Sequence, residues 1–264
     1  MLRWKEERQR ETALLIEGAR RIGKSTIVEE FAKNEYSSYI LVDFSKTATE
    51  INDLFNDLSD LNYIFLRLQL NYNVSLEERK SLIIFDEVQN NPKARQAIKH
   101  LVKDHRYDYI ETGSLISIRK NVQNIIIPSE ETRISMHPMD FEEFRWALGD
   151  NVTFTLLKTV LEQKQPLGEA IHRKLMRDFR LYMLVGGMPQ AVDKYIKTNN
   201  LSAVDTVKRD IIALYEEDLR KIDTSGKATA MFDAIPSQLS KNASRYTIST
   251  VIPGEKQDRI SDIV

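Results

Sequence analysis

Short apolar runs alternate with amphipathic stretches over the first two-thirds of the chain. The runs of strand length cover residues 12–17, 39–42, 81–85 and 109–110, and residues 133–137 supply a fifth. Apolar residues with helical spacing follow the first run, over residues 24–33, and precede the fourth, over residues 92–102. Near-continuous apolar runs separated by helices are typical of a parallel sheet covered on both faces. The pattern predicts an α/β fold.

The pattern changes after Pro138, where helical periodicity replaces the alternation. Helices are predicted over residues 141–148, 168–185 and 201–219, with a break at the GGMP sequence of residues 186–189. From about residue 224 onward the chain has short helical and turn segments. We therefore predict three parts: an α/β core at residues 1–140, a helical part at 141–223 and a third part at 224–264.

Composition narrows the class of protein. The 264 residues are 42% hydrophobic and 29% charged, which is typical of a soluble globular protein. The absence of cysteine excludes disulfides, thiolate metal sites and a cysteine nucleophile, and it fits an intracellular protein. The four histidines show no HxxxH or HExxH spacing, so no histidine metal site is predicted.

Charge and hydropathy bear on localisation and partners. The first eleven residues are dense in charge and lack the apolar segment of a secretory signal. No apolar run approaches the ~20 residues that a membrane span needs. We expect a cytoplasmic protein with no membrane partner. The net charge of -1 gives no overall attraction to nucleic acid, so DNA binding would require a local basic patch.

One segment after the first apolar run fits the phosphate-loop pattern GxxxxGK[ST]. Its glycines allow backbone amides to approach phosphate oxygens, and the helix that follows directs its N–H groups and its positive dipole end at the same anion. Lys24 is expected to reach the β- and γ-phosphates, Ser25 to bind Mg²⁺ and Thr26 to hold the α-phosphate. The predicted nucleotide-binding residues are Gly18, Ala19, Arg20, Arg21, Ile22, Gly23, Lys24, Ser25 and Thr26.

Two acids, Asp86 and Glu87, end the third apolar run. In an open parallel sheet the carboxyl ends of the strands form the ligand-binding edge, so both carboxylates can face the loop at residues 18–26. We expect Asp86 to join Ser25 around Mg²⁺ and Glu87 to activate the attacking water. An acid pair after a strand also serves as a helix N-cap, and the upstream phosphate loop favours the catalytic interpretation.

Three further residues are candidates for contacts with the nucleotide. Thr112 and Ser114 end the fourth run, where a hydroxyl can bind the γ-phosphate or the lytic water; an ordinary turn is the alternative. Arg133 lies at the start of the fifth run and can act as an arginine finger, within the chain or across a subunit boundary; a solvated arginine is the alternative.

Five motifs in order resemble one family. They are GARRIGKS at residues 18–25, IFDEVQ at 84–89, ETGS at 111–114, PMDFEEF at 138–144 and GGMP at 186–189. From residue 12 onward the chain resembles the prokaryotic AAA-type P-loop ATPases that carry a C-terminal DUF4143 region, which are relatives of the archaeal ATPases in the additional-strand class.

The resemblance implies a sheet ordered 5-1-4-3-2, a helical lid at residues 141–223 and a winged helix that begins near the IPSQLS sequence of residues 235–240. It also implies that the chain ends within the winged helix and lacks the DUF4143 region. The usual Gly-Arg pair before the fifth strand is Thr132-Arg133 here. ATP is expected over GTP from the family and from the lack of an NKxD sequence.

Two functions remain open on the sequence alone. The first is an Mg²⁺-dependent ATPase that couples hydrolysis to movement of the lid and winged helix on a macromolecular client, with DNA as the candidate that the winged helix implies. The second is a slow nucleotide-operated switch or DNA-binding regulator. A small-molecule kinase fits less well, because Glu87 beside Asp86 favours activating water. A homo-oligomer is required only if Arg133 acts on a neighbour.

Overall fold

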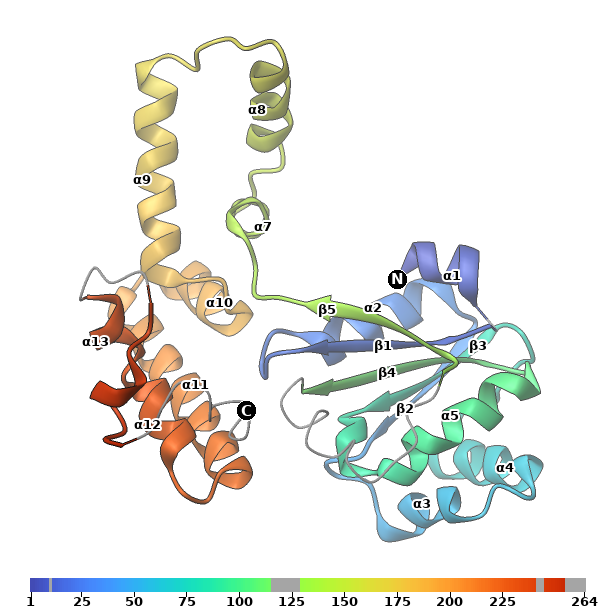
Figure 1. Cartoon of the computed structure of the whole chain (residues 1–264). Helices are drawn as coiled ribbons and strands as arrows, with labels where there is room; N and C mark the ends of the chain where they lie inside the picture. The colour runs from blue at the N-terminus through green and yellow to red at the C-terminus, as the bar shows by residue number, and fades with distance from the viewer. Residues whose placement is uncertain (10, 115–128, 241–244, 255–264) are drawn as a thin grey trace. The chain divides into compact units, whose positions relative to one another are not determined.

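Five parallel strands form one sheet in the computed structural model, which describes residues 1–9, 11–114, 129–240 and 245–254 (Figure 1). The strands are β1 (Ala13–Gly18), β2 (Ser38–Asp43), β3 (Ser81–Asp86), β4 (Asp108–Ser114) and β5 (Glu131–Met136). Their order is β2-β3-β4-β1-β5, and every pairing is parallel. Read from β5, this is the order 5-1-4-3-2 that the resemblance implies. The predicted α/β fold with a parallel sheet is confirmed.

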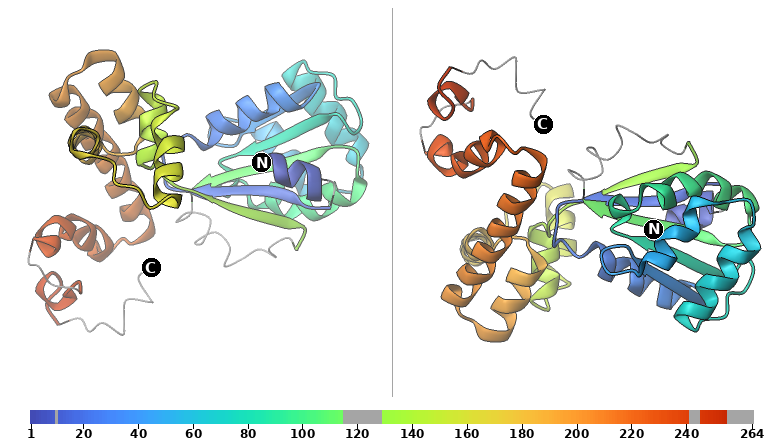
Figure 2. Two further views of the ribbon diagram at one scale, coloured as in Figure 1. Left: turned by 90° about the horizontal axis from the view of Figure 1, so that it is seen from above. Right: turned by 90° about the horizontal axis from the view of Figure 1, so that it is seen from below.

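Helices cover both faces of the sheet, as the views in Figure 2 show. One face packs against α1 (Leu2–Arg8) and α2 (Lys24–Glu35), and the other against α3 (Thr49–Asp53), the 3-10 helix η1 (Leu54–Asn56), α4 (Leu61–Tyr72) and α5 (Pro92–Asp104). Side chains of β1 alternate between the two layers: Leu14 and Ile16 join the first core, whereas Ala13 and Leu15 join the second. Burial on both faces explains the near-continuous apolar runs.

Side-chain caps fix where two of the helices begin. The Asn91 side chain accepts a hydrogen bond of 3.0 Å from the Ala94 amide, and Pro92 occupies the first position of α5, where its missing N–H costs nothing. A capping box of Asp140 and Glu143 begins α7 (Phe141–Ala147). The chain therefore turns into helix directly after β5, as predicted.

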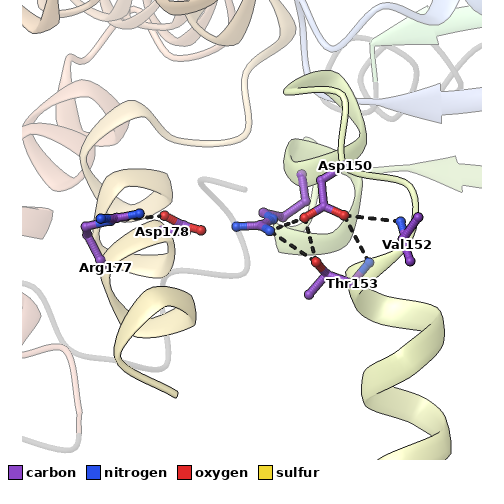
Figure 3. A network of polar contacts seen from close by, with 6 residues as sticks. Asp150, Val152, Thr153, Arg177 and Asp178 are labelled. Atoms are coloured by element: carbon purple, nitrogen blue, oxygen red, sulfur yellow. Dashed lines mark hydrogen bonds and ion pairs between the residues drawn. The ribbon is translucent and has the colours of Figure 1, made fainter. Parts of the chain in front are cut away.

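Asp150 organises the junction between α7 and α8 (Thr153–Glu162). Its carboxylate accepts hydrogen bonds from the amides of Val152 (3.1 Å) and Thr153 (2.9 Å) and from the Thr153 hydroxyl (2.6 Å), as Figure 3 shows. These bonds, the one to the Thr153 hydroxyl above all, lower the pKa of Asp150. Helix α8 was not predicted, and this polar turn is the feature that starts it.

The chain divides into two compact units, which are interleaved along the sequence. Unit 1 comprises residues 1–167 and 187–189, and unit 2 comprises residues 168–186 and 190–264. The described part of unit 2 is helical. Its helices are α9 (Glu169–Val185), α10 (Pro189–Thr198), α11 (Leu201–Ile222), α12 (Lys227–Asp233), α13 (Ile235–Leu239) and the 3-10 helix η4 (Ile248–Thr250).

This division groups α7 and α8 with the sheet, whereas the sequence analysis assigns residues 141–223 to a single lid. The helical character predicted for that region is present, and the break at residues 186–189 lies between α9 and α10. The lid and winged-helix assignments stay predictions, and residues 241–244 and 255–264 of the predicted winged helix lie outside the described residues. Within the described residues, no helix has the length and hydropathy of a membrane span.

Candidate functional site

The loop between β1 and α2 needs glycine at both fixed positions. A Cβ on Gly18 would lie 2.3 Å from the Met136 carbonyl oxygen, because β5 runs directly beside β1 there. Gly23 has a φ of +91°, in the left-handed region, and directly precedes α2. The loop thus leaves a β-strand and enters a helix N-terminus, which is the context that anion binding requires.

Lys24 is buried at the start of α2 and folds back over the loop. Its Nζ donates hydrogen bonds to the carbonyl oxygens of Gly18 (3.2 Å) and Ala19 (2.9 Å). Burial lowers the pKa of Lys24, while the carboxylates of Glu87 and Asp86 oppose that shift. The amine is therefore held within the loop and within the electrostatic range of both predicted acids.

Asp86 joins the loop to the central strands. Ser25 Oγ donates a hydrogen bond of 2.8 Å to Asp86 Oδ1, and the Thr112 hydroxyl donates to the same oxygen. Asp86 ends β3, beside the carboxyl end of β4. The Ser25 hydroxyl and the Asp86 carboxylate are oxygen donors of the kind that Mg²⁺ prefers. No cluster of three cysteine, histidine or acidic side chains suited to a metal occurs in the described residues.

Glu87 follows Asp86 in an unusual backbone conformation. Its φ of +53° lies in the left-handed region, which a residue with a side chain seldom adopts. The Glu87 amide donates to Thr112 Oγ1 (3.3 Å), and the Gln89 amide group donates to Glu87 Oε2. This sharp turn separates the two acids, so that they can serve different roles. Gln89 was missed as a site residue, although it lies in the IFDEVQ motif.

The two hydroxyl residues of β4 differ in position. Ser114 is the register partner of Gly18, so it lies beside the start of the loop, and its contact with the γ-phosphate or the lytic water stays a prediction. Thr112 lies two residues earlier and is fully buried, and its hydroxyl is bonded to Asp86 and Glu87. The structure therefore gives Thr112 a role in holding the acids, and its predicted contact with the nucleotide stays a prediction. The alternation of a strand explains why both residues occupy one face.

Arg133 is not brought to the loop. It is the register partner of Leu15, three residues before Gly18, which is about 10 Å along the strand. Its Nε donates to Glu131 Oε1 at 2.7 Å, and Glu131 lies beside Ala13, further still from the loop. A finger role within the chain is not supported, because this ion pair points Arg133 away from the loop. A role across a subunit boundary stays a prediction.

The two arginines of the phosphate loop, Arg20 and Arg21, differ in their surroundings. Arg20 lies close enough to Lys24 to contribute to lowering the pKa of that amine, so its charge adds to the positive potential over the loop. Arg21 is exposed, and its φ of +67° shows the strained turn of the loop. Ala19 and Thr26 are exposed, whereas Ile22 is buried and contributes to packing.

The end of the GGMP segment, residues 187–189, lies close to the phosphate loop. The Met139 amide donates to the Gly187 carbonyl oxygen at 2.8 Å, and a Cβ on Gly187 would lie 2.1 Å from the Met139 carbonyl oxygen. Pro189 lies beside the loop, since its Cγ is 3.9 Å from the position that a Cβ on Gly23 would take. Sequence reasoning treated this segment as a helix break and as a family motif, but not as a neighbour of the loop; the pair of glycines was the signal of a close backbone approach.

An apolar pocket of about 550 Å³ opens beside the loop, on the α2 side of β5. Ile27, which directly follows Thr26, forms part of its wall, and Asp140 and Glu143 add carboxylates. The other residues that line it include Ile16, Ile134 and Met136. The sequence did not identify this pocket, because its residues come from four separate segments of the chain.

A buried ionic cluster lies on the opposite face of the sheet. Arg95 of α5 pairs with Glu131 at 3.2 Å, and Glu131 also binds Arg133. Glu111 of β4 is fully buried beside them, and burial, with the neighbouring Glu131, raises the pKa of Glu111 well above its usual value. Sequence reasoning missed this cluster, because nothing in the spacing of these four residues predicts that they meet.

Two family models match the chain. A model described as an AAA domain matches residues 10–145, which is more than half of the chain. A second model, for a domain of unknown function (DUF8612), matches residues 176–258. The C-terminal match is thus to a family other than DUF4143, and the DUF4143 part of the predicted resemblance is not shown. The comparison with curated proteins finds no match.

Solved structures of low identity resemble the chain. They include C. elegans PCH-2 (12% identity, TM-score 0.39, 77% of this chain and 62% of that one) and the closed state of Hsp104 with ATPγS and FITC-casein (11%, 0.41, 92% and 50%). Orc1 of Aeropyrum pernix in complex with DNA is another (12%, 0.39, 96% and 76%). The chain spans less than two thirds of the first two proteins. TM-scores this low support no inference about function.

Proposed function

Because the chain belongs to the AAA domain family, we propose that it binds ATP with Mg²⁺ at the loop of residues 18–26 and hydrolyses it to ADP and phosphate. The observation that carries the proposal is the bond of 2.8 Å between Ser25 and Asp86. It joins the phosphate loop to the acid-bearing strand, so a metal and a triphosphate can be held by the same group of residues.

The loop supplies the phosphate contacts in this proposal. Backbone amides around Gly23 and the N-terminus of α2 bind the phosphate oxygens, and Lys24 exchanges its bonds to the Gly18 and Ala19 carbonyls for the β- and γ-phosphates. Ser25 and Asp86 would hold Mg²⁺. When bound, the ion neutralises charge on the phosphates.

Glu87 is the proposed general base, and Ser114 the proposed contact for the γ-phosphate or the water. The electrostatic interaction of the Glu87 carboxylate with Lys24 supports this role. Ser114 is the partner of Gly18 in the sheet register. A base that activates water opposite a fixed phosphate, together with the charges of Lys24 and Mg²⁺, supports hydrolysis.

The apolar pocket beside Ile27 is the proposed site of the base. Thr26 is expected to hold the α-phosphate, so the ribose and base extend past the residue that follows it in α2. A planar purine fits apolar walls such as those of Ile27 and Ile134. We propose adenine as the base, in agreement with the family, and Asp140 and Glu143 provide acceptors for its exocyclic amine.

We propose that residues 187–189 transmit the effect of nucleotide binding and hydrolysis to the helical region. This segment packs beside the loop and is continuous with α9 and α10, so a change at the phosphates can alter the helical region that follows. The client is a macromolecule, with DNA as one candidate, and the lid and winged helix are the proposed moving parts. The alternative is a nucleotide-operated switch or DNA-binding regulator with slow turnover, in which binding and not hydrolysis produces the effect.

The proposal is tested by measuring phosphate release and nucleotide affinity together. Glu87→Gln should keep ATP affinity and lose about 10²-fold or more in kcat, because it removes the base and leaves the loop intact. Lys24→Ala should lose nucleotide binding, whereas Lys33→Ala, on the exposed face of the same helix, should behave as wild type.

Normal ATP binding by Lys24→Ala would show the loop assignment to be wrong. Negligible release by the wild-type chain, with binding retained, would favour the slow switch.

A further inference from the structure

Gln89 is held by a fixed turn directly after the two acids. It is the middle residue of the 3-10 helix η2 (Val88–Asn90). The Asn90 amide donates to the Glu87 carbonyl oxygen and the Asn91 amide to that of Val88, both at 3.0 Å. Val88 is fully buried. Asn91 caps α5, so the turn is tied to core and helix on both sides.

The side chain of Gln89 donates from Nε2 to Glu87 Oε2. An amide donor adds no charge, and it fixes the rotation of the carboxylate that it binds. A carboxylate has two oxygens, so this bond leaves Oε1 available to accept from a water molecule. The backbone of Glu87 is fixed in the same way, by its bond to Thr112 Oγ1 and by its left-handed conformation.

We propose that Gln89 is a positioning residue for Glu87, which holds one carboxylate oxygen so that the other faces the attacking water. The inference rests on the proposed function. The bond to Gln89 and the fixed backbone of Glu87 hold one carboxylate oxygen in place and leave the other to accept from water.

The first experiment compares Gln89→Met and Gln89→Glu with Asn90→Met. Methionine keeps the length of the side chain without a donor, and an ionised glutamate keeps the shape but only accepts. Both Gln89 variants should lose about 10²-fold in kcat with KM for ATP and nucleotide affinity unchanged, because a misplaced base costs about that much. Asn90 is exposed in the same turn, so Asn90→Met should match the wild type.

A double-mutant cycle separates positioning from a general structural role. In a Glu87→Gln background, Gln89→Met should cause no further loss of kcat, because Gln89 acts through the carboxylate that is already absent. A further loss of the same size there, or a kcat for Gln89→Met that is unchanged or higher, would overturn the proposal.

Different results would contradict the proposed hydrolysis and the proposed role of Gln89. Turnover that is lost in Glu87→Gln but kept in both Gln89 variants overturns the role of Gln89 alone. A wild-type chain that binds ATP without turnover overturns the proposed hydrolysis, and the role of Gln89 with it. Thermal unfolding of each variant identifies any loss that comes from misfolding.

Discussion

Glu111 carries an acidic group in the interior of the sheet, where a charge is costly. Burial is the main reason why its pKa is raised, and the charge of Glu131 adds to it; Arg95 and Arg133 act in the opposite direction. The raised pKa favours the protonated form of Glu111, which can donate a hydrogen bond to Glu131. A shared proton then allows two acids to lie side by side below α5.

This predicts that Glu111→Gln changes the pH dependence of stability. Above pH 4.5 the unfolded chain releases the proton of Glu111 while the folded chain retains it, so the free energy of unfolding falls as pH rises, until the raised pKa is passed. Glutamine does not titrate. The variant should therefore gain stability relative to wild type with rising pH, by up to about 1.4 kcal/mol per pH unit.

Urea denaturation at pH 5 to 8 measures the difference, with exposed Glu50→Gln as the control. The prediction would be contradicted if the free energies of unfolding of wild type and Glu111→Gln changed with pH by the same amount.

Among the helices and strands, the sequence predicts those whose positions are determined by apolar periodicity and by helix caps. All five strands and helix α5 lie within a few residues of their predicted bounds. The full burial of Glu111 and Thr112 in β4 was not predicted, because these residues are polar and their burial depends on neighbours from β3, β5 and α5. Likewise, the loop and both acids follow from motifs, whereas Gln89 and Pro189 required coordinates.

The close approach of residue 187 to residue 139 yields a prediction for two neighbouring glycines. Gly187→Ala should lower both stability and ATP affinity, because its Cβ would displace the segment that carries Pro189 from the loop. A displacement costing about 1.4 kcal/mol lowers affinity tenfold. Gly186→Ala should lower stability only: its φ of +82° disfavours alanine, but no described atom lies within 4 Å of the added carbon.

Calorimetric titration with ATP, together with thermal unfolding, distinguishes the two variants. Equal ATP affinity in both would show that the contact with Met139 does not matter for the site.

For the whole molecule, residues 187–189 lie beside the nucleotide loop and are continuous in sequence with the helical unit. We expect ATP, trapped with Mg²⁺ in Glu87→Gln, to slow amide hydrogen exchange in peptides that cover residues 18–26 and also in those that cover residues 185–192. Peptides from α12 should exchange at an unchanged rate. Protection confined to the loop would show that the nucleotide state does not reach this segment.

The interleaving of the two units also sets an order for biosynthesis. Three chain crossings, after residues 167, 186 and 189, divide the units. A ribosome that has translated as far as α9 has released the whole sheet but not the residues that pack against Met139 and Gly23. The sheet unit is therefore completed only after α9, which belongs to the other unit, has been synthesised. A protease cut or an expression boundary at any single crossing would leave at least one of the units without part of its chain.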